Sequence, residues 1–156
     1  MAARLSSAQG YVAHPVLWCD PFGLKQYSQV ANPALQARID ALTSNQKGQV
    51  GEDIAQEMFE GRYLRDHPRG DKYEVNGRTY IPDLTLTSNQ IVEVKFVKKL
   101  DLRRQIRDGL AHAGPGNYIL VTAPNTHLSR GVRKLIESGQ IIHKTMPESL
   151  IERMVP

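Results

Sequence analysis

The sequence predicts an α/β domain with a mixed central sheet flanked by helices and preceded by an N-terminal extension. Three observations favour this class. Apolar residues repeat at helical spacing before residue 61, and the period changes to two after residue 72. Later segments alternate between the helical period and short apolar runs typical of strands. Residues 1–31 show neither period, so we expect them to form a tail or linker.

Two helices are expected before the first strand. Asn32 suits an N-cap position, Pro33 suits the first helical position, and apolar residues follow at helical spacing. The stretch SNQKG, residues 44–48, is expected to end this helix. A second helix is predicted over residues 48–61, with Gly61 at its end.

Three strands are expected after the second helix. The dipeptide Asn76-Gly77 predicts a tight hairpin turn. Pro82 indicates a bulge or an edge position near the start of the second strand. The polar stretch TSNQ forms the next turn, and the third strand is predicted over residues 91–98.

The remaining elements alternate between helices and strands. The unbroken apolar run NYILVTAP is typical of a strand that is buried on both faces. The predicted elements are a helix over 101–114, that strand over 117–124, a helix over 128–139, a strand over 140–146 and a final helix over 147–154.

Length, cysteine content and charge limit the classes of function. A chain of 156 residues can form one domain with its own core. No apolar run approaches the roughly 20 residues that cross a bilayer, so we expect no membrane binding. Cys19 is the only cysteine, which excludes internal disulfides and zinc sites built from cysteine pairs. The net charge of +4 permits an acidic partner such as nucleic acid without requiring one.

Three charged residues, Asp83, Glu93 and Lys95, stand where half-buried strands favour uncharged side chains. Because side chains alternate across a strand, Glu93 and Lys95 share one face, roughly 7 Å apart at Cα. The other face is apolar, and the preceding antiparallel strand can bring Asp83 beside the pair. Two close carboxylates repel each other unless a cation neutralises them.

A hard divalent cation, Mg²⁺ or Mn²⁺, would suit these carboxylates, because it takes oxygen ligands and can screen charge on a phosphate. Lys95 could orient or deprotonate the attacking water, or stabilise the pentavalent phosphorus centre. The pattern therefore predicts metal-assisted phosphodiester hydrolysis. In the alternative interpretation, Asp83 lies in a turn and Glu93 and Lys95 form a solvated stripe on an open face.

A basic cluster follows the third predicted strand. A phosphate backbone beside the strands would meet this cluster, which would give salt-dependent binding that is indifferent to sequence. The alternative is a solvated helix face. The candidate nucleic-acid-binding residues are Lys98, Lys99, Arg103, Arg104 and Arg107.

The stretch "IPD…EVK", with nine residues between Asp83 and Glu93, resembles the PD-(D/E)xK nuclease superfamily and its restriction-endonuclease-like fold. The segments KGQVGEDIAQEMF, IPD, EVK and RRQIRDGLAHA, in this order, look like the restriction-endonuclease-fold toxin domains of bacterial polymorphic toxins. The resemblance covers roughly residues 47–146. It implies that Asp83 and Glu93 bind metal, that Lys95 is catalytic, and that the enzyme is a metal-dependent endonuclease.

The same resemblance implies two further site residues. Glu52, in the "GxxGE" of the second helix, would reach the metal, and Gln105 in the following helix would assist. Glu52 could instead be a carboxylate favoured by the helix dipole, and Glu57 competes with it for the metal. Gln105 could be a partly exposed polar residue. Most of the superfamily cuts DNA, so DNA is the expected substrate. A tRNA-cleaving toxin and a catalytically inactive nucleic-acid-binding module are the alternatives.

The stretch PVLWCDPFGL, residues 15–24, resembles the end of the core of Rhs/YD-repeat proteins, directly before their variable toxin domain. The resemblance implies self-cleavage after Leu24, with Asp20 taking part. The alternative is an incidental turn. The fixed positions of the motif are Pro15, Asp20, Pro21, Gly23 and Leu24.

This second resemblance also implies a setting for the chain. It would be the tip of a larger effector that a bacterium secretes, and it would act in the cytoplasm of competitor cells. Its partners would be nucleic acid, a cognate immunity protein and the parent Rhs core. The predicted organisation is a remnant of the Rhs core over 1–24, a linker with one helix over 25–46 and the nuclease domain over 47–156.

Overall fold

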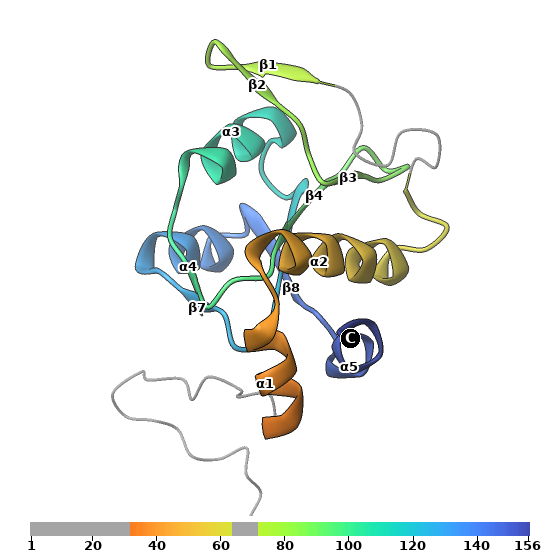
Figure 1. Cartoon of the computed structure of the whole chain (residues 1–156). Coiled ribbons are helices and arrows are strands. Elements are labelled where there is room, and N and C mark those ends of the chain that lie inside the picture. Colours follow the sequence, from red (N-terminus) through yellow and green to blue (C-terminus); the bar gives the residue numbers. More distant parts are fainter. Residues whose placement is uncertain (1–31, 64–71) are drawn as a thin grey trace, which may run out of the picture.

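The structure, a computed structural model, describes residues 32–63 and 72–156 (Figure 1). The α/β class is confirmed, because helices cover a mixed central sheet. The candidate self-cleavage motif over residues 15–24 lies outside the described residues.

The described residues form helices that correspond to those expected. None of these helices is long and apolar enough to cross a membrane. The helices are α1 (Pro33–Ala41), α2 (Ser44–Met58), α3 (Arg104–Ala113), α4 (Arg130–Glu137) and α5 (Glu148–Met154).

The central sheet has the strand order β3-β4-β6-β8. β3 runs antiparallel to β4, whereas β4, β6 and β8 are mutually parallel, so the sheet is mixed as expected. These strands are β3 (Leu84–Thr85), β4 (Ile91–Lys95), β6 (Tyr118–Thr122) and β8 (Ile141–Thr145).

Two small strand pairs lie beside the central sheet. The first is the predicted hairpin of β1 (Tyr73–Val75) and β2 (Arg78–Tyr80). Its turn residues, Asn76 and Gly77, both have positive φ, which the two-residue hairpin turn requires. The second pair, parallel β5 (Lys99–Leu100) and β7 (His127–Leu128), was not expected from the sequence.

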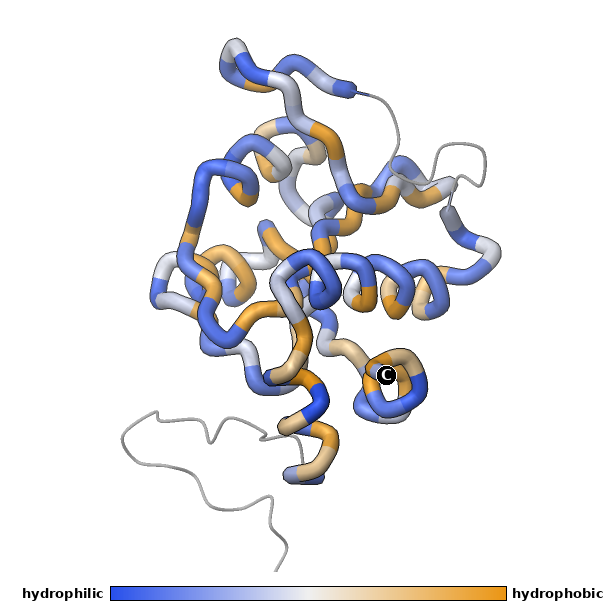
Figure 2. Tube along the Cα trace, in the orientation of Figure 1, coloured by the Kyte–Doolittle hydropathy of each residue, from blue (hydrophilic) through white to orange (hydrophobic). Residues whose placement is uncertain are grey.

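Each face of the central sheet is covered by its own hydrophobic cluster (Figure 2). On one face, β4 residues Val92, Val94 and the following Phe96 pack with α1, α2 and α5. On the other face, Ile91 packs with the β1–β2 hairpin, α3 and α4. β4 lies between β3 and β6, which makes it an interior strand with opposite environments on its two faces.

Helix α2 begins earlier than the sequence predicted. Thr43 and Gln46 form a capping box, in which Thr43 Oγ1 accepts from the Gln46 N–H while Gln46 Oε1 accepts from the Thr43 N–H. The stretch SNQKG therefore starts the second helix, and the expectation that it ends the first was wrong. The predicted N-cap of α1 is confirmed, because Asn32 Oδ1 accepts from two backbone N–H groups.

Helix α1 packs into the core. Its residues Leu35 and Ile39 are buried in the cluster that also covers α2. The helix predicted within residues 25–46 is therefore present, and it is part of the same folded unit as the residues after it.

Helix α3 begins at Arg104, three residues after the expected start at Asp101. The backbone before it is engaged in pairing with β7, since the carbonyl oxygens of Lys98 and Leu100 accept from the N–H groups of His127 and Ser129. Residues 101–103, which join this pair to α3, are neither strand nor helix, and Arg103 is the extended N-cap residue.

Candidate active site

Strand β4 carries Glu93 and Lys95 on the face opposite α2. The alternation that the sequence predicts is confirmed, because Val92 and Val94 belong to the α2-facing cluster. The Glu93 side chain has an exposed fraction of 0%. Glu93 therefore does not belong to a solvated stripe, and that alternative interpretation is wrong for this residue.

Both carboxylate oxygens of Glu93 are hydrogen-bonded. Lys95 Nζ lies 2.5 Å from Oε1, and the Tyr80 hydroxyl donates to Oε2 at 3.1 Å. Burying a carboxylate without such partners would cost several kcal/mol, on the order of the penalty for an uncompensated buried ion. The Lys95 side chain has an exposed fraction of 21%, so the pair joins the buried carboxylate to the surface of the domain.

The pKa of Glu93 is raised from 4.5 to about 7, chiefly by burial and secondly by the negative charge of Asp83. Lys95 and the Tyr80 hydrogen bond act in the opposite direction, because both favour the ionised carboxylate. The influence of Asp83 on this pKa indicates that the two carboxylates lie close enough to repel each other, as the spacing in the sequence predicted.

Asp83 lies between Pro82 and β3, where the chain turns into the central sheet. Its Oδ2 accepts a hydrogen bond from the Val94 N–H at 2.7 Å. The antiparallel register pairs Leu84 with Val92, which sets Asp83 beside the middle of β4. The sequence-based expectation that the preceding strand brings Asp83 next to Glu93 is confirmed.

Lys95 lines a pocket of about 240 Å³ beside the start of α3. Gln105 also lines this pocket, so the structure brings the predicted assisting residue to the same hollow as the predicted catalytic lysine. Lys99 and Arg103 contribute positive charge to its wall. Ammonium and guanidinium groups of this kind bind phosphate oxygens through charge-assisted hydrogen bonds.

Glu52 lies on α2, which packs against the other face of the sheet. The neighbouring Gly51 contacts Val94 and Phe96 of the α2-facing cluster. In residues 32–63 and 72–156, no group of three or more His, Cys, Asp and Glu side chains is arranged to hold a metal ion. The role of Glu52 at the metal therefore stays a prediction. Its competitor Glu57 is engaged in an ion pair with Arg153 of α5.

The five residues of the basic cluster, Lys98, Lys99, Arg103, Arg104 and Arg107, are all exposed. Lys98 forms an ion pair with Asp40 at 3.0 Å, and Lys99 forms one with Asp101 at 3.5 Å. Exposed ion pairs contribute little free energy and exchange readily with other anions. A phosphate backbone could therefore replace these carboxylates at low cost.

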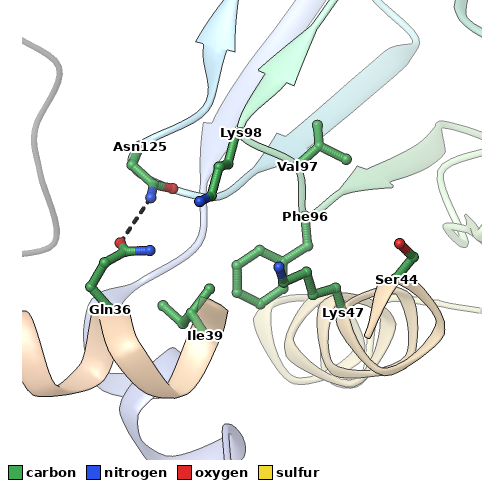
Figure 3. A pocket seen from close by; sticks show the side chains of 8 residues that line it. All are labelled: Gln36, Ile39, Ser44, Lys47, Phe96, Val97, Lys98 and Asn125. Carbon is green, nitrogen blue, oxygen red and sulfur yellow. Dashed lines mark hydrogen bonds between the residues drawn. The ribbon is translucent and has the colours of Figure 1, made fainter. Parts of the chain in front are cut away.

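A second pocket, of about 230 Å³, lies between α1, α2 and the segment that follows β4 (Figure 3). Asn125 donates a hydrogen bond to Gln36 at 3.0 Å, which ties α1 to the loop after β6. None of the residues that line this pocket is acidic. None of the predicted catalytic or metal-binding residues lines it, whereas Lys95 and Gln105 line the pocket beside α3.

Sequence reasoning missed Tyr80 as a site residue. The hydroxyl of Tyr80 reaches Glu93 because Tyr80 packs in the cluster that covers this face of the sheet, which a pattern of apolar and polar residues does not reveal. The one signal in the sequence was its position three residues before Asp83, within the same YIPD stretch.

The residues present fit a bound divalent cation. Glu93 and Asp83 supply oxygen ligands at one point of the sheet, and their mutual repulsion favours a cation between them. Mg²⁺ is commonly held by one or two carboxylates together with waters, so two acidic residues suffice.

Residues 63–132 match the model of one protein family, described as restriction endonuclease fold toxin 7. This part of the chain resembles restriction endonuclease fold toxin domains. Asp83, Glu93, Lys95 and Gln105 lie within the matched region of the toxin domain, whereas Glu52 precedes it. The match suggests a nuclease toxin. Neither a curated protein nor a solved structure matches the chain significantly.

Proposed function

We propose that this toxin domain is a Mg²⁺-dependent endonuclease that hydrolyses the phosphodiester bonds of DNA in competitor cells. One observation carries the proposal: a fully buried glutamate, Glu93, lies beside a second carboxylate, Asp83, with Lys95 Nζ 2.5 Å from it. A purely structural strand would gain by replacing such a buried ionic group with apolar residues.

The residues divide the work of hydrolysis. Asp83 and Glu93 would hold the ion, with Glu52 as a candidate third carboxylate. When bound, Mg²⁺ supplies a more acidic water and stabilises negative charge on the phosphate. Lys95 would orient or deprotonate the attacking water, or stabilise the phosphorus centre as charge builds on it. Gln105, on the same pocket, would orient Lys95 or the substrate.

The basic cluster supports a nucleic acid as the substrate. Lys99 and Arg103 line the pocket of Lys95, so a backbone phosphate held by them would lie next to the reactive groups. Such contacts neutralise phosphates without reading bases. DNA is the proposed substrate, because most of the superfamily that the motif resembles cuts DNA. Transfer RNA is the second candidate.

We also propose that the domain is delivered as the C-terminal tip of an Rhs-type effector. The stretch PVLWCDPFGL supports this setting through its resemblance to the end of an Rhs core. Self-cleavage after Leu24, secretion by the producing bacterium and action in the target-cell cytoplasm follow from the same resemblance. A cognate immunity protein with an acidic surface would complement the basic cluster and prevent killing of the producer.

The test is a cleavage assay with purified protein. Plasmid DNA and total tRNA are incubated separately with the protein, in Mg²⁺, in Mn²⁺ and in EDTA. Cleavage of plasmid in Mg²⁺ but not in EDTA is the expected result. Cleavage of tRNA alone would move the substrate to RNA. If neither is cut while both bind, the domain is an inactive nucleic-acid-binding module and the proposed enzyme is wrong.

A further inference from the structure

Tyr80 brings a hydroxyl into the buried part of the candidate site. The residue ends β2 and has an exposed fraction of 4%. Its hydroxyl donates to Glu93 Oε2 at 3.1 Å, on the side of the carboxylate that Lys95 does not occupy. The two donors therefore hold opposite ends of one carboxylate, and together they fix the plane in which its oxygens lie.

The β1–β2 hairpin that carries Tyr80 is fastened to α3, over which it lies (Figure 1). Asp108 of α3 accepts hydrogen bonds from Asn76 at 3.2 Å and from Arg78 at 3.3 and 3.4 Å. These donors hold the pKa of Asp108 below its usual range, so it stays ionised and paired with Arg78. The hairpin that carries Tyr80 is therefore held against α3 by these hydrogen bonds.

Helix α3 also provides the space that the Tyr80 hydroxyl occupies. A Cβ at Gly109 would lie 2.7 Å from the Tyr80 hydroxyl oxygen and 2.4 Å from Cε2 of Tyr118. Any side chain larger than hydrogen would therefore push Tyr80 away from Glu93. The absence of a side chain at Gly109 permits the close approach on which the hydrogen bond depends.

We propose that Tyr80 is a positioning residue that orients the Glu93 carboxylate for metal binding. This inference rests on the proposed function. Lys95 holds only Oε1, and its ammonium would share its donors between Glu93 and the water or phosphate, so a carboxylate held by Lys95 alone would rotate more freely. The hydrogen bond from Tyr80 keeps Oε2 in place. Residues that orient metal ligands in this way typically change metal affinity by about 10–100-fold when removed.

The test compares two conservative variants, Tyr80→Phe and Tyr118→Phe. Each removes one hydroxyl from a buried ring in the same cluster. Among the described residues the Tyr118 hydroxyl has no hydrogen-bond partner, which makes it the matched control. Binding of Mn²⁺ is measured by calorimetry on the folded protein without nucleic acid, and cleavage is measured separately as kcat and KM. Circular dichroism and thermal melting verify that both variants are folded.

Tyr80→Phe is expected to weaken Mn²⁺ binding about 10-fold or more and to lower kcat, with KM for nucleic acid nearly unchanged. Tyr118→Phe is expected to match the wild type in all three quantities. Equal Mn²⁺ affinity and equal kcat in Tyr80→Phe and wild type would overturn the inference. If the wild type itself neither binds Mn²⁺ nor cuts nucleic acid, the proposed function fails first, so the two failures are distinguishable.

A double-mutant cycle separates positioning from a general structural effect. If Tyr80 acts through Glu93, Tyr80→Phe has no further effect on Mn²⁺ binding in the Glu93→Gln background. If the two losses simply add, Tyr80 acts independently of Glu93 and the inference is wrong. The cycle also distinguishes positioning from destabilisation if Tyr80→Phe lowers the melting temperature. An effect on Mn²⁺ binding that came only from lost stability would also appear in the Glu93→Gln background.

Discussion

Lys95 Nζ lies 2.5 Å from Oε1 of Glu93, and Glu93 has no exposed surface. An ammonium group on the rim of a pocket is thus paired with a carboxylate inside the core. Removing one partner of a buried ion pair costs about 3–5 kcal/mol, whereas replacing both by apolar groups is often harmless. The pair is therefore poorly explained by stability alone, and its reactivity can be tested residue by residue.

Glu93→Gln is expected to abolish cleavage while the protein stays folded. The substitution keeps the size of the side chain and removes the negative charge that would hold the ion. Loss of several kcal/mol of charge stabilisation corresponds to a rate decrease of about a thousandfold or more. Initial rates of plasmid nicking measure the effect. Glu74→Gln, at an exposed strand glutamate of β1, is the matched control and should cut at the wild-type rate.

Lys95→Ala is expected to lower kcat by at least about 100-fold, the usual contribution of a positioned acid–base group. Killing of target cells should be lost in parallel, and binding of nucleic acid should remain. The control is Lys144→Ala, which removes an exposed lysine from β8 of the same sheet. A Lys95→Ala enzyme that cuts at the wild-type rate would refute the catalytic role of this residue.

The stability of the metal-free protein is expected to fall as the pH rises from about 4.5 to about 7. The folded-state pKa of Glu93 is about 7 and its ordinary value is 4.5, so the folded state binds more protons within this window. The destabilisation that comes from ionising the buried Glu93 is absent below the unfolded-state pKa of Glu93. It is complete above the folded-state pKa, where it is on the order of 3 kcal/mol. Urea unfolding in EDTA at several pH values measures it, and Glu93→Gln should flatten this slope.

Gly109→Ala is expected to destabilise the domain, although alanine is the better helix former. The added Cβ would meet Tyr118 Cε2 at 2.4 Å, and overpacking of this kind typically costs about 1–3 kcal/mol. Gly48 offers the matched control within α2, since a Cβ there meets nothing within 4 Å. Gly48→Ala should stabilise the domain by up to about 1 kcal/mol. Denaturant midpoints compare the two, and equal shifts would show that Gly109 has no packing role.

Neutralising Lys99 and Arg103 together is expected to weaken nucleic-acid binding to the same degree for all sequences. Each lost phosphate contact should reduce the slope of log K against log salt by about 0.9 on duplex DNA. Fluorescence anisotropy in the Glu93→Gln background measures binding without cleavage. Lys144→Gln, which removes one exposed charge away from the basic cluster, serves as the control for each single substitution, and a change of equal size in that variant would contradict a specific role for the basic cluster.

The sequence alone determined the order of the helices and of the strands other than the β5–β7 pair, and it determined the residues of the acidic pair. Asn76-Gly77 predicted the hairpin turn because this dipeptide tolerates the positive φ that such a turn needs. The alternation along 91–96 predicted which side chains share a face, because a strand leaves no other choice. The spacing of Asp83 and Glu93 then predicted their proximity. These are local rules of backbone geometry, and they act wherever the chain folds.

Only the tertiary structure decided how the site is surrounded. The full burial of Glu93, its hydrogen bond from Tyr80 and the clearance at Gly109 come from a hairpin and a helix that cross the same face of the sheet. The parallel pairing of β5 with β7 likewise brings together segments that are far apart in the chain. Such effects depend on which segments meet in space, and a pattern of residue types along the chain does not carry that information.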